Sequence, residues 1–182
     1  KQLNYALSDR YQLGIYPGEI GSSEIFNSMD EGFKGAIIVG LGLLSSFTAY
    51  QLTQTVQQGV CKYLLYIDQQ SKLNKVRSLG LSALIVGSGY GGLSVENAVR
   101  AIIQGVHNAN DKIQKLRNES GAIIENLEFV EVFEDAALNC FYSLRKIVMD
   151  CNPYGQPQAN TNAGRGKLVE PNYGKTKRQY RI

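Results

Sequence analysis

Apolar residues in this chain form two kinds of pattern, short continuous runs and long stretches in which they recur every three or four positions. Three short runs, at 35–42, 81–87 and 127–133, predict buried strands. Each is followed by a stretch with one apolar face at helical spacing. The chain therefore repeats one order of elements three times: strand, turn and amphipathic helix.

The three helices predicted after these runs differ in how clearly they begin. The first starts around Ser45 or Ser46, whereas Ser94 is well placed to cap the second. A shorter strand is predicted at 24–26, after a turn at Pro17 and Gly18. The predicted apolar faces consist of Leu52, Val56, Val60, Tyr63 and Ile67 in the first helix, Val95, Val99, Ile102, Val106, Ala109, Ile113 and Leu116 in the second, and Ala137, Phe141, Leu144 and Val148 in the third.

Strands that alternate with helices indicate an α/β layer structure with a largely parallel sheet. Such sheets bind ligands outside the carboxyl ends of their strands. Two glycine turns follow predicted strands, one at 40–42 and one at 87–92. We therefore expect both turns at the ligand-binding edge of the sheet.

Composition narrows the class of protein. The chain has 182 residues, of which 43% are hydrophobic and 19% charged, with a net charge of +3, as in a soluble globular domain. Its apolar runs fall short of the roughly 20 residues that a membrane span needs. The three cysteines show no C-x-x-C spacing, so we expect neither a disulfide framework nor a zinc site, and a reducing cytoplasm fits best. We also predict no cofactor.

Charge and composition change after Asp150, and we place a domain boundary there. Residues 1–150 form the predicted domain, and 151–182 a flexible linker rich in Gly, Asn and Pro that ends in a basic tail. The tail, 165–182, holds six basic residues against one acidic residue, a net charge of +5. It either contacts nucleic acid or an acidic partner, or is a solvated linker. The mildly acidic body predicts no nucleic-acid binding.

The richest glycine segment is Gly87-Ser-Gly-Tyr-Gly-Gly92, between a predicted strand and a predicted helix. Backbone N–H groups in such a loop, together with the helix N-terminus, can hold a phosphate. Alternatively, the glycines only allow the chain to turn and pack closely. A Rossmann loop would be followed by an acidic residue at the end of the next strand, about 20 residues later, whereas here that strand ends about twice as far away, at Glu131 to Glu134. A Walker A loop would contain a lysine, which this loop lacks.

The order of these segments resembles the C-terminal two-thirds of a macro domain, over about residues 34–149. It includes Ala-Leu-Ile-Val-Gly-Ser-Gly-Tyr-Gly-Gly-Leu-Ser, a long helix, and then Leu-Glu-Phe-Val-Glu-Val-Phe with a closing helix. The stretch Lys34-Gly-Ala-Ile-Ile-Val-Gly-Leu-Gly42 is more similar to the related N-terminal domain of leucyl aminopeptidases. The resemblance implies a three-layer domain, with a mixed, largely parallel central sheet flanked by helices, that binds ADP-ribose.

Carried over residue by residue, the resemblance implies a ligand site built mainly from two glycine segments. Phe133 stands where an aromatic residue often lies near the adenine, or else it is a core residue of the last strand. The Asn-Ala-Ala-Asn and Gly-Gly-Val-Asp segments of hydrolytic members are missing. The implied phosphate loop is Gly87, Ser88, Gly89, Tyr90, Gly91 and Gly92, and the implied facing rim is Gly40, Leu41 and Gly42.

Other candidate chemistry is sparse. Ser45 and Ser46 have no histidine nearby, and the single histidine, His107, lies within a predicted helix, so we expect no Ser–His nucleophile. Acidic residues gather around the last strand, at Glu125, Glu128, Glu131, Glu134 and Asp135. Glu131 and Glu134 would point to opposite faces of a straight strand, which favours a solvated edge over a cation site or an acid/base pair. Cys140 is expected in the core.

These observations predict a non-catalytic binding or regulatory module, part of a larger multidomain protein, whose ligand carries a phosphate or diphosphate group. Two alternatives stay open. One is a structural domain that contacts neighbouring domains or another protein and binds no small ligand. The other is a hydrolase that processes ADP-ribose.

Overall fold

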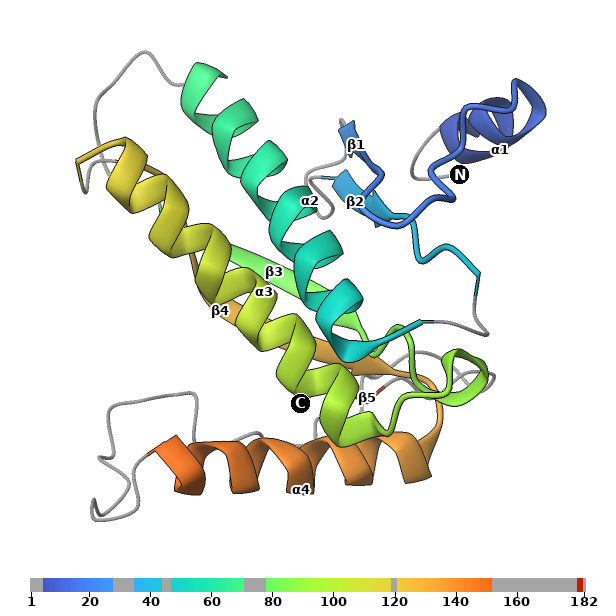
Figure 1. Cartoon of the computed structure of the whole chain (residues 1–182), viewed down its shortest axis with the longest axis vertical. Coiled ribbons are helices and arrows are strands. Elements are labelled where there is room, and N and C mark those ends of the chain that lie inside the picture. Colours follow the sequence, from blue (N-terminus) through green and yellow to red (C-terminus); the bar gives the residue numbers. More distant parts are fainter. Residues whose placement is uncertain are drawn as a thin grey trace.

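The computed structural model describes residues 5–27, 35–43, 47–70, 78–118, 121–151 and 180–181. It confirms a mixed α/β fold (Figure 1). Its elements, in chain order, are α1 (Ala6–Gln12), β1 (Ser23–Asn27), β2 (Gly35–Val39), α2 (Ala49–Gln70), β3 (Ser78–Leu84), the 3-10 turn η2 (Gly89–Gly91), α3 (Val95–Leu116), β4 (Ile123–Glu131), α4 (Glu134–Cys151) and β5 (Tyr180–Arg181).

Within the described residues the strands form two separate sheets. Strands β1 and β2 pair antiparallel, whereas β3 and β4 pair in parallel, with β5 added antiparallel to β4. Helix α3 connects the two parallel strands, so β3, α3 and β4 form a βαβ unit. The predicted parallel pairing is confirmed for the second and third runs. The first run, β2, instead pairs with the β1 strand predicted at 24–26.

Helices α2 and α3 lie side by side and run in the same direction (Figure 1). The Thr53 hydroxyl donates to the Ala101 carbonyl at 3.3 Å, and the Cys61 thiol contacts the Ala109 carbonyl at 4.0 Å, with the same offset of 48 residues. Gly105 allows this close approach, because a Cβ there would lie 2.9 Å from the Thr53 carbonyl oxygen. The opposite side of α2 carries the β1–β2 hairpin.

Helix α2 begins later than Ser45 or Ser46, and those two residues lie outside the described part of the chain. The reason is a reciprocal cap. The Thr48 backbone N–H donates to Gln51 Oε1 at 2.9 Å, and the Gln51 backbone N–H donates to Thr48 Oγ1 at 3.3 Å. This capping box satisfies N–H groups that have no partner inside the helix.

Helix α3 confirms the cap predicted at Ser94, whose hydroxyl accepts the Asn97 backbone N–H at 3.2 Å. Five of its seven predicted apolar positions are buried. Val95 is half-buried, and Leu116 is 64% exposed, so its predicted place on the buried face is wrong. Leu116 is the last residue of the helix, beyond the part that packs on the sheet.

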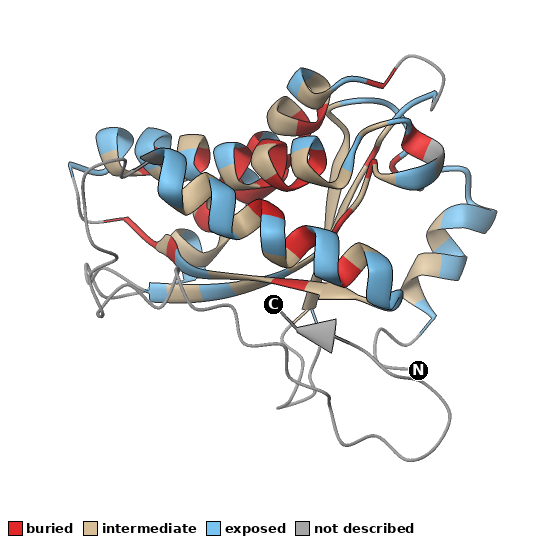
Figure 2. Cartoon of the chain, turned by 90° about the horizontal axis from the view of Figure 1, so that it is seen from below, coloured by how far each residue is buried: buried red, intermediate tan, exposed pale blue. Residues whose placement is uncertain are grey.

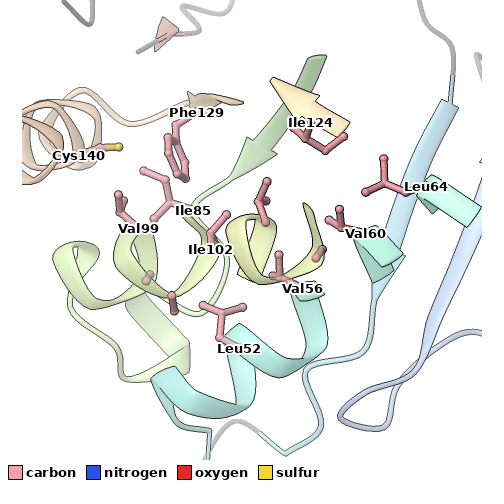
Figure 3. Close-up of a cluster of buried hydrophobic side chains, with 14 of the residues drawn as sticks. Leu52, Val56, Val60, Leu64, Ile85, Val99, Ile102, Ile124, Phe129 and Cys140 are labelled. Atoms are coloured by element: carbon pink, nitrogen blue, oxygen red, sulfur yellow. The ribbon is translucent and has the colours of Figure 1, made fainter. Parts of the chain in front are cut away.

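The main hydrophobic core lies between helices α2 and α3 and the β3–β4 sheet (Figure 3). Phe129 and Ile124 reach it from β4, and Leu52 and Leu64 from α2. Cys140 of α4 is fully buried in this core, as predicted. Figure 2 shows that the long helices turn buried residues inward and exposed residues outward.

Both parallel strands begin and end earlier than their apolar runs suggest. Strand β3 spans Ser78–Leu84 rather than 81–87, and β4 spans Ile123–Glu131 rather than 127–133. Helix α4 continues one residue past the predicted boundary, to Cys151. Most of the predicted linker, 152–179, lies outside the described residues, whereas 180–181 form β5. In the described part of the chain, no helix is both long and apolar enough to cross a membrane.

Candidate functional site

The glycine segment predicted as a phosphate loop connects β3 to α3. The Ser88 hydroxyl donates to the Ile85 carbonyl at 2.8 Å, and the Leu93 N–H donates to the Gly87 carbonyl at 3.1 Å. A 3-10 turn, Gly89–Gly91, forms the tip of the loop. The loop is thus a folded turn at the carboxyl end of a parallel strand, the edge where α/β folds bind ligands.

The glycines of this loop are needed for two different physical reasons. Gly87, Gly89 and Gly92 have φ angles of +84°, +69° and +76°, a backbone region that favours glycine. Gly87 is also crowded, since a Cβ there would lie 2.8 Å from the Phe47 ring. Gly89 and Gly92 are exposed, and a Cβ at either would have no protein atom within 4 Å. The tip therefore borders open space.

Phe47 packs against the glycine loop, although it was not predicted as part of the site. It is buried directly before the cap of α2, and its ring lies close to Gly87. A signal for it exists: an apolar residue before the cap and another at the fourth helical position form a hydrophobic staple. Phe47 and Leu52 occupy those two positions around the capping box of Thr48 and Gln51.

The loop leads into the N-terminus of a 22-residue helix, which carries about half a positive charge. Glu96 lies in its first turn, but Lys146 and Arg100 pair with the Glu96 carboxylate at 3.0 and 3.1 Å. Their hydrogen bonds hold the pKa of Glu96 below its ordinary value, and Lys146 makes the larger contribution. Arg100 also pairs with Asp150 at 2.6 Å, so the network ties α3 to α4 beside the loop.

Phe133 lies at the same edge of the sheet as the glycine loop. Because Leu84 pairs in parallel with Val130, the segments that follow these two residues leave the sheet at the same end. Phe133 is 68% exposed, so its alternative role as an inward core residue is wrong. The strand ends before it because Glu131 Oε1 accepts the Val132 and Phe133 backbone N–H groups at 2.7 and 3.2 Å.

The predicted facing rim, 40–42, packs against its own N-terminal segment. The Gly40 N–H donates to the Ser22 carbonyl at 2.9 Å, and the Gly42 N–H donates to the Gly18 carbonyl at 2.8 Å. A Cβ at Gly40 would lie 2.2 Å from the Glu19 carbonyl oxygen, and one at Gly42 would lie 2.6 Å from the Ile20 side chain. Leu41, between them, is half-buried against the main core.

The acidic residues near β4 have separate roles. Glu125 and Glu128 accept hydrogen bonds from Ser78 and Ser82 across the β3–β4 pair. Glu134 starts helix α4, so the argument that placed it on one straight strand with Glu131 is wrong. Among the residues that the structure describes, no group of three or more His, Cys, Asp and Glu side chains could hold a metal ion.

The remaining candidate nucleophiles are not assembled into a site in the described part of the chain. His107 pairs with Asp111 at 3.5 Å on the exposed side of α3. It lies twelve residues after the start of the helix, about 18 Å along the helix axis from the glycine loop. Burial raises the pKa of Cys140 to about 12 and also raises that of Cys61, so both stay as neutral thiols at pH 7.

Comparison of the sequence with models of known protein families gives no match, and comparison with curated proteins gives no significant match.

Proposed function

We propose that this chain is a non-catalytic binding or regulatory module with a macro-like three-layer α/β arrangement. Its ligand is an anion with a phosphate or diphosphate group, such as ADP-ribose, bound at 87–92. The order of parallel strand, glycine loop, long helix, strand and closing helix supports this proposal. The single histidine, His107, lies about 18 Å along α3 from the loop, which fits a binding rather than a hydrolytic role.

One observation carries the proposal, the open glycine tip of the loop. Gly89 and Gly92 adopt conformations that other residues disfavour, yet no neighbouring protein atom occupies the space where a Cβ would lie. That space remains available to a ligand that approaches the backbone closely. In such a site backbone N–H groups and the helix dipole favour an anion, and no lysine is required.

Phe133 adds a feature that a plain phosphate would not need. Its ring is exposed at the edge to which the glycine loop belongs. An exposed aromatic face can stack on a nucleobase. The proposed ligand therefore combines a diphosphate with a base, and its affinity should exceed that of pyrophosphate alone.

Calorimetric titration with ADP-ribose, ADP and pyrophosphate tests this function. The proposal expects binding of all three, with the nucleotides tighter than pyrophosphate. Phe133→Ala should weaken ADP-ribose binding by roughly three- to tenfold, the cost of a lost stacking contact, and leave pyrophosphate binding unchanged. No binding at millimolar concentration would refute the proposal, and turnover of an ADP-ribosylated protein would replace it with the hydrolase alternative.

A specific observation favours a second candidate function, contact with a neighbouring domain or another protein. Helix α4 exposes Leu138, Tyr142 and Met149 by 40%, 62% and 60%, and their spacing of four and seven residues places them on one face. Exposed apolar patches mark interaction sites. Glutamine at all three positions should reduce binding of a hydrophobic dye, and unchanged dye binding would remove the support for this candidate.

We also propose a reducing cytoplasmic location. Cys61 and Cys140 are free thiols in the structure. Cys61 lies at the contact between α2 and α3, whereas Cys140 of α4 is buried in the main core, so neither has a disulfide partner among the described residues.

A further inference from the structure

Helix α4 lies along one margin of the described structure, and the other helices lie on one side of it (Figure 1). Its inward face is covered, since Ala137 and Cys140 are fully buried. Its outward face is not covered in the described part of the chain, although it carries the exposed apolar side chains of Leu138, Tyr142 and Met149. A surface helix normally keeps such residues on its buried side. Helix α4 therefore has a second apolar face.

The outward face of α4 has the spacing of a helix–helix contact. Its exposed positions follow one another at steps of three, four, three and four residues: Asp135, Leu138, Tyr142, Arg145 and Met149. At about 100° per residue, they lie within about 80° of the helix circumference. Alternating steps of three and four are typical of residues along which one helix packs on another. We call these five residues the α4 seam.

The two charged members of the α4 seam have no ionic partner within the described residues. Neither Asp135 nor Arg145 takes part in an ion pair there. The Arg145 guanidinium instead lies over the Phe141 ring, 6.0 Å from its centre. Lys146 and Asp150 of the same helix, by contrast, pair with α3. The seam thus carries one unpaired negative charge near its start and one unpaired positive charge near its end.

The α4 seam is complementary to itself. Asp135 and Arg145 lie equally far before and after position 140, and so do Leu138 and Tyr142. A two-fold axis at this level therefore sets each Asp135 of two antiparallel α4 helices opposite an Arg145, and each Leu138 opposite a Tyr142. The acidic and basic positions are about 15 Å apart along one helix, so the two ion pairs flank the apolar centre. A parallel pair of helices would instead oppose like charges.

We propose that two copies of this chain associate through the α4 seam, with their α4 helices antiparallel and centred at residue 140. Leu138 and Tyr142 form the apolar centre, and Asp135 pairs with the partner's Arg145 at each end. The contact is small by the standard of stable interfaces, so the dissociation constant should be on the order of 10 to 100 μM. This inference rests on the second candidate function, contact through α4, and does not depend on the ligand proposed for the glycine loop.

Sedimentation velocity of the whole chain in low salt, from roughly 5 to 500 μM, tests this association. The wild type should change from monomer to dimer over this range. Asp135→Arg and Arg145→Asp should each weaken association roughly tenfold, because each replaces two attractive pairs with two repulsive ones. The double variant, Asp135→Arg with Arg145→Asp, restores both pairs at unchanged net charge and should dimerise like the wild type.

Matched charge changes outside the seam separate this contact from net charge. Asp111→Arg and Lys115→Asp alter the charge equally, but both residues are exposed and lie about three to four turns beyond Arg100, where α3 pairs with α4. Both controls should dimerise like the wild type. Leu138→Gln and Tyr142→Gln together should weaken association at least about thirtyfold, since the apolar centre is lost from both copies. Circular dichroism checks that every variant is folded.

Three results would overturn the proposal. The first is a dimer that the single charge variants leave unchanged or that the double variant fails to restore. The second is a monomer throughout the range whose hydrophobic-dye binding falls with Leu138→Gln, Tyr142→Gln and Met149→Gln, which would assign the α4 face to another protein. The third is a monomer whose dye binding these substitutions leave unchanged, which would also remove the support for the second candidate function.

Discussion

The two glycine turns of this protein look alike in sequence, but they differ in how closely other atoms approach their glycines. In the first turn, a Cβ at Gly40 would lie 2.2 Å from the Glu19 carbonyl oxygen, and one at Gly42, whose φ is +64°, would lie 2.6 Å from the Ile20 side chain. In the second, Gly89 and Gly92 face no protein atom within 4 Å and are required only by their positive φ. The first turn is closed by packing, whereas the tip of the second, beyond the crowded Gly87, borders open space.

Gly40→Ala should have the largest effect on stability among these turns. The new Cβ would lie 2.2 Å from the Glu19 carbonyl oxygen, and backbone atoms move aside only at a cost of about 3 kcal/mol. Urea denaturation measures this loss. Gly18→Ala is the matched control, because Gly18 has no positive φ and nothing within 4 Å, so its stability should stay within about 0.5 kcal/mol of wild type.

Gly105→Ala extends the comparison to a helical glycine that is crowded by a neighbouring helix. Helix propensity alone would make alanine more stable by about 1 kcal/mol. The structure predicts the opposite sign, a loss of about 2 kcal/mol, because the Cβ would meet the Thr53 carbonyl and Val56 at 2.9 Å. A more stable Gly105→Ala variant in thermal denaturation would show that α2 and α3 are not packed this closely.

Gly89→Ala should cost less, about 1 kcal/mol, because only the backbone conformation is strained. Gly89→Asn should cost less still, since asparagine tolerates positive φ. Gly14 is the matched control: its φ is also +69° and it too has no atom within 4 Å, so Gly14→Ala should destabilise the chain equally. A loss several times larger at Gly89 would mean that its loop is packed rather than open.

The smallest effect concerns the ion pairs beside the open loop. Because Lys146 and Arg100 lower the pKa of Glu96 in the folded chain, its contribution is present above the ordinary carboxyl pKa and lost as pH falls through the lowered value. Glu96→Gln should therefore be slightly less stable than wild type at about pH 6, with a smaller difference at an acidic pH below the ordinary carboxyl pKa. Urea midpoints at the two pH values measure this difference in stability. A difference that persists in acid would show that it does not come from the ion pairs of Glu96.

Local structure could be predicted from the sequence where one pattern determines it. Helix α3 follows from an apolar spacing of three and four residues together with a capping serine at Ser94. The parallel β3–β4 pair follows from the long helix between two apolar runs. Periodicity, however, describes one element at a time, so it could not show that β2 pairs with β1 rather than with the parallel strands.

The candidate site shows the same limit at the level of single residues. The apolar run through Phe133 does not reveal that the Glu131 side chain ends the strand two residues earlier, which leaves that ring exposed. Glycine spacing likewise cannot tell a turn closed by neighbouring atoms from an open one, because those neighbours are distant in sequence. Phe47 could have been predicted, since the hydrophobic staple and the capping box around it are local sequence signals.

The most direct test of the account is a calorimetric titration of wild type and Gly89→Asp with ADP-ribose, with Gly14→Asp as the matched control. The account predicts binding by the wild type and by Gly14→Asp. It also predicts a loss of roughly five- to thousandfold for Gly89→Asp, since a carboxylate about 4 Å from a phosphate costs ~1 to 4 kcal/mol. Equal affinity of all three chains, or no binding by the wild type, would contradict the claim that the open glycine loop is an anion site.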